Sequence, residues 1–165
     1  MKTKTSLYIS LILILFSNSI LNADTIFFDS KNIKIEEDGN IIIAKQGTAK
    51  IPTQNILIEG DKSIYNKIVS ELFITGNVKF FDDLNNVYVE SEKAIFNSKT
   101  NKLLAIGITL IQIEDTYDIY SKDILYDRNS MKISSKFETS ILDNLNNIYI
   151  LNDGFLFDTF KETIS

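Results

Sequence analysis

The sequence predicts an all-β protein built from stacked β-hairpins. Short runs of Ile, Val, Tyr, Phe and Thr alternate with polar residues, and Asn, Asp or Gly interrupts them about every 8–12 residues. Beyond Ala23, no segment keeps apolar residues at the spacing of an amphipathic helix over several turns. The runs also recur at a fixed period, which is typical of repeat architectures. With 44% hydrophobic and 11% aromatic residues, the chain has enough apolar material for a core.

Residues 1–23 have the features of a signal peptide. Two lysines near the start precede an uninterrupted run of ten residues, Leu7–Phe16, that is almost entirely apolar. A membrane-spanning helix needs about 20 apolar residues, so this run favours the core of an export signal over an uncleaved anchor or a buried helix. We expect Ala23 to end the leader and residues 24–165 to form one exported domain.

The composition excludes several function classes. The chain has no Cys and no His, which removes disulfides, thiol nucleophiles, Ser-His-Asp triads and the usual zinc sites. Its formal net charge is −5, and Arg128 is its one arginine, so it lacks the clustered cations of a nucleic-acid-binding protein. Carboxylates, Lys, Tyr, Ser and Thr remain for chemistry, so most enzyme classes are excluded. We predict no catalytic residues, no cofactor, no metal site and no nucleic-acid partner.

Internal repetition gives the order of the elements. Leu84–Val89 recurs as Leu145–Ile150, 61 residues later. An aliphatic residue, an aromatic residue and then Asn or Asp recur at intervals of 31, 30 and 31 residues. These triplets are Ile64-Tyr65-Asn66, Ile95-Phe96-Asn97, Leu125-Tyr126-Asp127 and Leu156-Phe157-Asp158. Gly47, Gly76 and Gly107 form a second series, spaced by 29 and 31 residues.

Each unit of about 30 residues is predicted to contain two strands joined by an Asn/Asp turn, because Asn and Asp tolerate left-handed backbone. The first strands are expected at 56–66, 87–97, 119–127 and 148–158. The second strands are expected at 72–81, 103–113 and 132–142. The glycines of the second strands are expected at bulges or at close strand approaches.

The two-residue period of a strand assigns an apolar stripe to one face of the sheet. Its candidate residues are Ile58, Ile74, Val78, Phe80, Val87, Val89, Ile111, Ile148 and Ile150. Tyr88 and Glu90 fall on the opposite face. Strict alternation also places the aromatic residues of the triplets on that opposite face, unless a corner or bulge redirects them inward. The sequence leaves these two possibilities open.

The repeats resemble the OstA-like domain of lipopolysaccharide-transport proteins, a β-jellyroll found in LptA, LptC and the N-terminal part of LptD. The segments that carry the resemblance are 58–65 with 74–80 and 89–96 with 105–109. Segments within 28–47 resemble the family's first hairpin, and Asp143–Tyr149 resembles the stretch that leads toward the barrel of LptD. The third repeat departs from the pattern, with Lys122 in place of an acidic residue and no glycine near Lys136.

The resemblance implies an open, twisted jellyroll that is a carrier and not an enzyme. The apolar stripe would line a groove for the acyl chains of lipopolysaccharide, and strand edges would dock with other Lpt jellyroll proteins. We expect a periplasmic, outer-membrane-associated protein of a Gram-negative bacterium. Asp143–Tyr149 favours an LptD-like piece, whose partners would include an outer-membrane barrel and its lipoprotein plug. The alternative is a standalone LptA-like bridge.

Two other classes fit the repeats less well. A polysaccharide-acting β-helix enzyme would need two carboxylates about 5–10 Å apart across a cleft, whereas the adjacent pairs at 36–38, 82–83 and 114–115 are typical of solvated turns. A β-solenoid adhesin with calcium sites would need loops such as D-x-D-x-D-G, and Asp38–Asn40 matches only a hairpin turn.

Overall fold

The predicted all-β class is confirmed by the computed structural model, which describes residues 25–114 and 116–164. The proposed signal peptide lies outside these residues. The described chain contains twelve strands in one antiparallel sheet that does not close into a barrel. The strands are β1 (Phe27–Glu36), β2 (Ile41–Ile51), β3 (Ile56–Asn66), β4 (Glu71–Asp82), β5 (Val87–Asn97), β6 (Lys102–Ile113), β7 (Tyr117–Asp127), β8 (Lys132–Ser135), β9 (Thr139–Asp143), β10 (Ile148–Leu151), β11 (Phe155–Asp158) and β12 (Thr163–Ile164). Two 3-10 turns, η1 (Glu37–Gly39) and η2 (Pro52–Gln54), flank β2.

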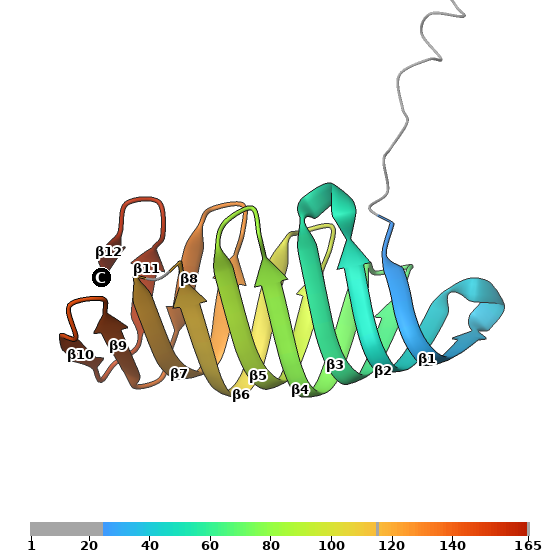
Figure 1. Cartoon of the computed structure of the whole chain (residues 1–165), viewed down its shortest axis with the longest axis horizontal. Coiled ribbons are helices and arrows are strands. Elements are labelled where there is room, and N and C mark those ends of the chain that lie inside the picture. The colour runs from blue at the N-terminus through green and yellow to red at the C-terminus, as the bar shows by residue number, and fades with distance from the viewer. Residues whose placement is uncertain (1–24, 115, 165) are drawn as a thin grey trace, which may run out of the picture.

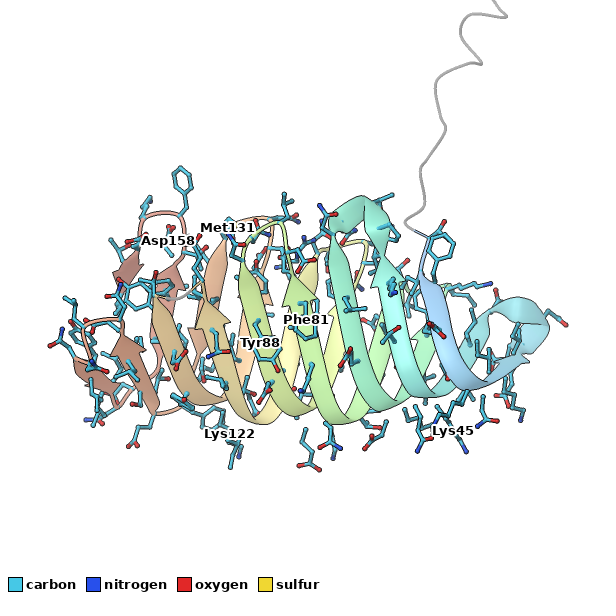
Figure 2. All side chains as sticks on the ribbon, viewed as in Figure 1. Lys45, Phe81, Tyr88, Lys122, Met131 and Asp158 are labelled. Carbon is cyan, nitrogen blue, oxygen red and sulfur yellow. The ribbon has the colours of Figure 1, made fainter. Side chains whose placement is uncertain are left out.

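The long strands bend near their middle, so the sheet folds into a trough with two walls (Figure 1). Wall A comprises 27–30, 47–51, 56–59, 78–82, 87–91, 108–113, 117–121, 139–143 and 148–151. Wall B comprises 32–36, 41–45, 62–66, 71–75, 93–97, 102–105, 124–127, 132–135, 155–158 and 163–164. Figure 2 shows Lys45 and Lys122 at the bent edge, and Met131 and Asp158 toward the opposite edge, which we call the mouth.

In β3, β5 and β7, the bend reverses the alternation of inward and outward side chains, whereas β4 and β6 keep it. Between β3 and β4 the register shifts between Glu59 and Lys62, and a bulge of this kind adds a residue on one strand. Ile58 points inward before the bend. Tyr65, seven positions later, would point outward under strict alternation, but it is buried as well. The redirection that the sequence left open therefore occurs: the aromatic residues of the four triplets are all buried, and the aliphatic residues beside them are not.

Two glycines of the spaced series show why glycine is required at their positions. Gly76 has a φ of +76°, a backbone conformation that L side chains rarely adopt. It lies where the β4–β5 register shifts between Thr75 and Val78. Gly47 lies beside β1, and a Cβ there would collide with the backbone of Asp29 and Ser30. The glycines thus mark a bulge and a close strand approach, as predicted.

The predicted repeat is confirmed through β7 and breaks after it. β3 and β5 have the same bounds as the predicted strands 56–66 and 87–97. β4 is longer than the predicted strand 72–81 by one residue at each end, and β6 begins one residue before the predicted strand 103–113. The predicted strands 132–142 and 148–158 are wrong as single elements, because each divides at its corner into two strands. β8 and β11 continue wall B, while β9 and β10 continue wall A, so the sheet forks at this end. Among the described residues, no helix is long and apolar enough to span a membrane.

Candidate functional site

The inner surface of the trough is apolar along both walls. Directly paired residues in antiparallel strands share a face, so the ladder pairs define rows of inward side chains. The wall A row is Phe28, Ala49, Ile58, Phe80, Val89, Ile111, Ile119, Ile141 and Tyr149. A wall B row is Ile35, Ile42, Tyr65, Leu72, Phe96, Leu103, Tyr126, Ile133, Phe157 and Ile164. An apolar lining therefore runs from β1 to the last strands.

The two walls pack directly against each other in the middle of the trough. The ring of Phe80 on wall A lies 5.6 Å from that of Phe96 on wall B, and 6.5 Å from that of Tyr126. Further along, the rings of Tyr117 and Phe157 are 5.2 Å apart across the same interior. The middle of the trough is thus a filled core in this conformation.

Seven of the nine predicted stripe residues lie in this core. They are Ile58, Ile74, Val78, Phe80, Val87, Val89 and Ile111, with exposed fractions of 2% or less. The structure thus brings these seven together as one inner lining, drawn from β3 to β6. Contact between them and a lipid stays a prediction.

Ile148 and Ile150 are not on the inner face, which corrects the face assignment of these two residues. The β4–β5 turn pairs Asp82 with Val87, whereas the β9–β10 turn pairs Leu142 with Ile148 and contains one residue more. A slip of one residue moves every side chain of a strand to the other face. Tyr149 therefore pairs with the buried Ile141, and Ile148 and Ile150 lie on the outer face, 65% and 64% exposed.

The inner lining becomes accessible at the two ends of the trough. At the N-terminal end, Ile33 and Ile35 pair with inward residues of β2, yet they are 49% and 62% exposed. β1 is the last strand at this end of the sheet (Figure 1), so no further strand covers its inward side chains from beyond it. At the other end, the inward Tyr149 and Ile164 are 44% and 37% exposed. A molecule in solution therefore meets the lining first at its ends.

Polar side chains cross the mouth near its middle. The guanidinium of Arg128, directly after β7 on wall B, donates to both carboxylate oxygens of Asp82 on wall A, with Nε–Oδ2 2.6 Å and Nη2–Oδ1 3.0 Å. Arg128 also donates to the side chain and the backbone carbonyl of Gln54, at 3.1 and 3.0 Å. Gln54 Nε2 in turn donates to the carbonyl of Ser98 on wall B, at 3.3 Å. We call Gln54, Asp82, Tyr126 and Arg128 the clasp.

Asp82, Tyr126 and Arg128 of the clasp are buried, Gln54 is half-buried, and the carboxylate of Asp82 is fully hydrogen-bonded. The side chains of Arg128 and Asp82 are 6% and 0% exposed. The hydroxyl of Tyr126 donates to Asp82 Oδ2 at 2.9 Å, and Asn85 donates to the same oxygen at 2.7 Å. Burial raises the pKa of Asp82, but hydrogen bonds from Arg128 and Asn85 and the positive charge of Arg128 outweigh it, so the pKa lies below its usual value. Asp82 is therefore an ionised carboxylate at neutral pH.

Sequence reasoning missed the clasp as a site. It noted Arg128 only as the one arginine, and Asp82 only as half of an adjacent carboxylate pair. The structure separates that pair, since Asp82 is buried and Asp83 is exposed. The chemistry of arginine could have indicated the site, because the several N–H donors of a guanidinium make it the usual partner of a buried carboxylate.

Next to the clasp, toward the C-terminal end, the mouth contains a cavity of about 250 Å³. Asn85 and Ile113 line it from the wall A side, and Met131 and Phe157 from the wall B side. Phe157 belongs to the core and Tyr117, which also lines the cavity, packs against that core, so the cavity leads from the mouth to the inner lining. In the part of the chain that the structure describes, no cluster of three or more acidic side chains is arranged to hold a metal ion.

The comparisons place this trough among known folds. No protein-family model matches the chain, and no curated protein matches it. Among solved structures, it is similar to LptH of Pseudomonas aeruginosa, titled the LptA-homologous periplasmic component of a conserved lipopolysaccharide transport device. The match has a TM-score of 0.62 at 11% identity and covers 68% of this chain and 82% of LptH. The predicted OstA-like jellyroll fold is thereby confirmed.

Proposed function

We propose that this chain is an LptA-like periplasmic bridge that carries lipopolysaccharide with its acyl chains sheltered between the two walls. The observation that carries the proposal is the continuous apolar inner lining, exposed at the N-terminal end, in a fold similar to that of LptH. Transfer of apolar surface out of water is worth about 25 cal/mol per Å², so such a lining retains acyl chains and gives them a path between membranes.

The LptA-like reading has better support than the LptD-like one. LptH, whose solved structure is similar to this chain, is titled as an LptA homologue. The segment Asp143–Tyr149, which favoured LptD, forms the end of β9, a turn and the start of β10. An outer-membrane barrel and its lipoprotein plug are accordingly left out of the proposed partners, and the periplasm is the proposed location.

Unpaired strand edges suit docking with other Lpt jellyroll proteins. Within the described residues, β1 pairs only with β2 at one end of the sheet, and β10 and β12 each have one partner at the other end. An edge strand presents free N–H and C=O groups, which a strand of another protein can pair with. Edge-to-edge stacking would align the exposed inner lining of one protein with that of the next.

Site-specific photocrosslinking in a Gram-negative periplasm tests the proposal. Ile35 and Ile150 make a matched pair, because both are isoleucines on edge strands, 62% and 64% exposed, on the inner and outer faces respectively. A photoreactive residue at either position replaces an exposed side chain and leaves the core intact. We expect lipopolysaccharide adducts at Ile35 and none at Ile150.

Equal adduct yields at both positions would indicate nonspecific contact with lipid and contradict the proposal. Absence of adducts at Ile35 in a folded, exported protein would also contradict it. A second inner position, Val89, with Tyr88 beside it on the outer face, extends the test to the middle of the trough.

A further inference from the structure

The filled interior raises a question that the proposed function does not answer. A guest between the walls must separate Phe80 from Phe96 and from Tyr126, whose rings are in contact across the trough. The walls are continuous through the bends at the bottom, so separation must take place at the mouth. The clasp lies there, and it joins residues far apart in the sequence: Arg128 is 46 residues from Asp82 and 74 from Gln54.

The other polar contacts of the mouth run along each wall. On wall A, the backbone N–H groups of Asp83 and Glu114 donate to Asn55 and Asn86, and on wall B that of Ser98 donates to Ser70. These bonds connect neighbouring turns of one wall and survive if the walls part. The clasp bonds connect wall to wall and must break.

An ion pair at this place is poorly explained by stability. Replacing a buried ion pair by apolar residues of similar volume is often neutral or stabilising, because desolvating two charges costs as much as their attraction returns. A bidentate arginine–carboxylate pair is instead specific in geometry, and water can solvate both charges once the mouth opens. Specific geometry in the closed state and hydration of both charges in the open state suit a contact that breaks and then re-forms between the same two side chains.

We propose that the clasp is a gate: Arg128 with Asp82 and Gln54 holds the empty trough shut, and its release parts the walls so that an acyl chain enters sideways through the mouth. The cavity beside the clasp, which leads from the mouth to Phe157, is where entry begins. The nature of the guest rests on the proposed function, whereas the gate itself is a property of this chain that is measurable without lipid.

The test uses the absence of cysteine from the sequence to report local opening. Val87→Cys places a thiol beside the clasp, since Val87 pairs with Asp82, and Ala105→Cys places one near the bend. Both native side chains are buried, at 2% and 1% exposure. The rate of reaction with a thiol reagent under native conditions then compares opening at the mouth with opening at the bottom of the trough.

The clasp is weakened in two ways, by Asp82→Asn and by the milder Gln54→Ala, which leaves the ion pair in place. We expect labelling at position 87 to rise at least about tenfold more than labelling at position 105 in Asp82→Asn, because global destabilisation acts on both thiols and opening of the mouth acts on position 87 alone, and by a smaller margin in Gln54→Ala. Equal increases at both thiols would mean that the clasp only stabilises the whole fold, and no increase at position 87 would mean that it does not hold the mouth. Either result overturns the gate.

A second arm connects the gate to lipid. Cysteines at Gln54 and Ser98, tethered by a short thiol crosslinker, keep the mouth shut across the 3.3 Å contact of the native residues. Tethering is expected to abolish lipopolysaccharide adducts at Val89, and cleaving the linker is expected to restore them. Adducts that persist in the tethered protein would contradict entry through the mouth. If no adducts form even without the tether, the proposed function fails, while the labelling result still decides the gate.

Discussion

Removing either charge of the clasp is expected to destabilise the fold strongly, and removing both is expected to cost much less than the sum. Asp82→Asn leaves the guanidinium of Arg128, 6% exposed, without its counter-charge, and Arg128→Met leaves a fully buried carboxylate. Breaking a buried pair in this way costs about 3–5 kcal/mol. In Asp82→Leu/Arg128→Met no unpaired charge remains, although Tyr126 and Gln54 lose hydrogen-bond partners. We expect its loss to be about 1–3 kcal/mol.

The assay is urea unfolding of the purified domain, with the free energy of unfolding extrapolated to water for wild type, both single variants and the double variant. Lys102→Ala serves as the control, because it removes the Lys102–Asp127 pair, whose lysine is 48% exposed, and an exposed pair is worth about 0–1 kcal/mol. Single-variant losses no larger than that of Lys102→Ala, or strictly additive losses in the double variant, would refute the reasoning.

Three further predictions concern the pH response, the first hairpin and the core. The folded-state pKa of Asp82 is lowered, so its contribution to the free energy of unfolding is fully present above about pH 4 and is lost as the pH falls through the folded pKa. The stability difference between wild type and Asp82→Asn is therefore expected to shrink between pH 7 and pH 3 in parallel urea titrations. Gly47→Ala is expected to loosen β1, since a Cβ would collide with Asp29, and hydrogen exchange should accelerate in β1 but not in β5. Phe80→Ala, at a fully buried position, is expected to cost about 3–5 kcal/mol by thermal or urea unfolding, and a loss below about 1 kcal/mol would contradict the packed interior.

Local patterns were sufficient to predict the strands and their period. The alternation in 56–66 and 87–97 and the turns at Asn and Asp predicted β3 and β5 directly, because these features depend on neighbouring residues. The division of 132–142 and 148–158 into separate strands was not predicted. It depends on corners where the repeat has lost its glycine, at Lys136, or gained one at Gly154, and periodicity carries no information about pairing there.

In β3 and β5 the faces were predicted only as far as the bend, whereas in β4 the prediction held across it. Alternation placed Ile58 and Val89 inward, where the structure has them, but a bulge restarts the alternation, as it does before Tyr65. Ile148 and Ile150 were predicted to point inward because they occupy the repeat positions of Val87 and Val89. In the structure they lie on the outer face, because the turn before them contains one residue more. Register depends on turn length, which similarity between repeats does not determine.

The clasp could not be predicted because its wall A members, Gln54 and Asp82, lie 44 or more residues from Tyr126 and Arg128 on the other wall. Asp82 and Arg128 each stand at the end of a strand next to a turn, where charged residues are usually solvated. Their burial follows from the folding of the sheet into two walls, which brings the end of β4 opposite the end of β7.

The central claim is that the trough binds the acyl chains of lipopolysaccharide, and a binding titration with and without those chains tests it most directly. An environment-sensitive dye on Ile35→Cys reports on the exposed inner lining, and the same dye on Ile150→Cys serves as the outer-face control. The account predicts a saturable response to intact lipopolysaccharide at position 35 only, and none to the fully deacylated carbohydrate. Equal responses to the two ligands, or a response confined to position 150, would contradict it.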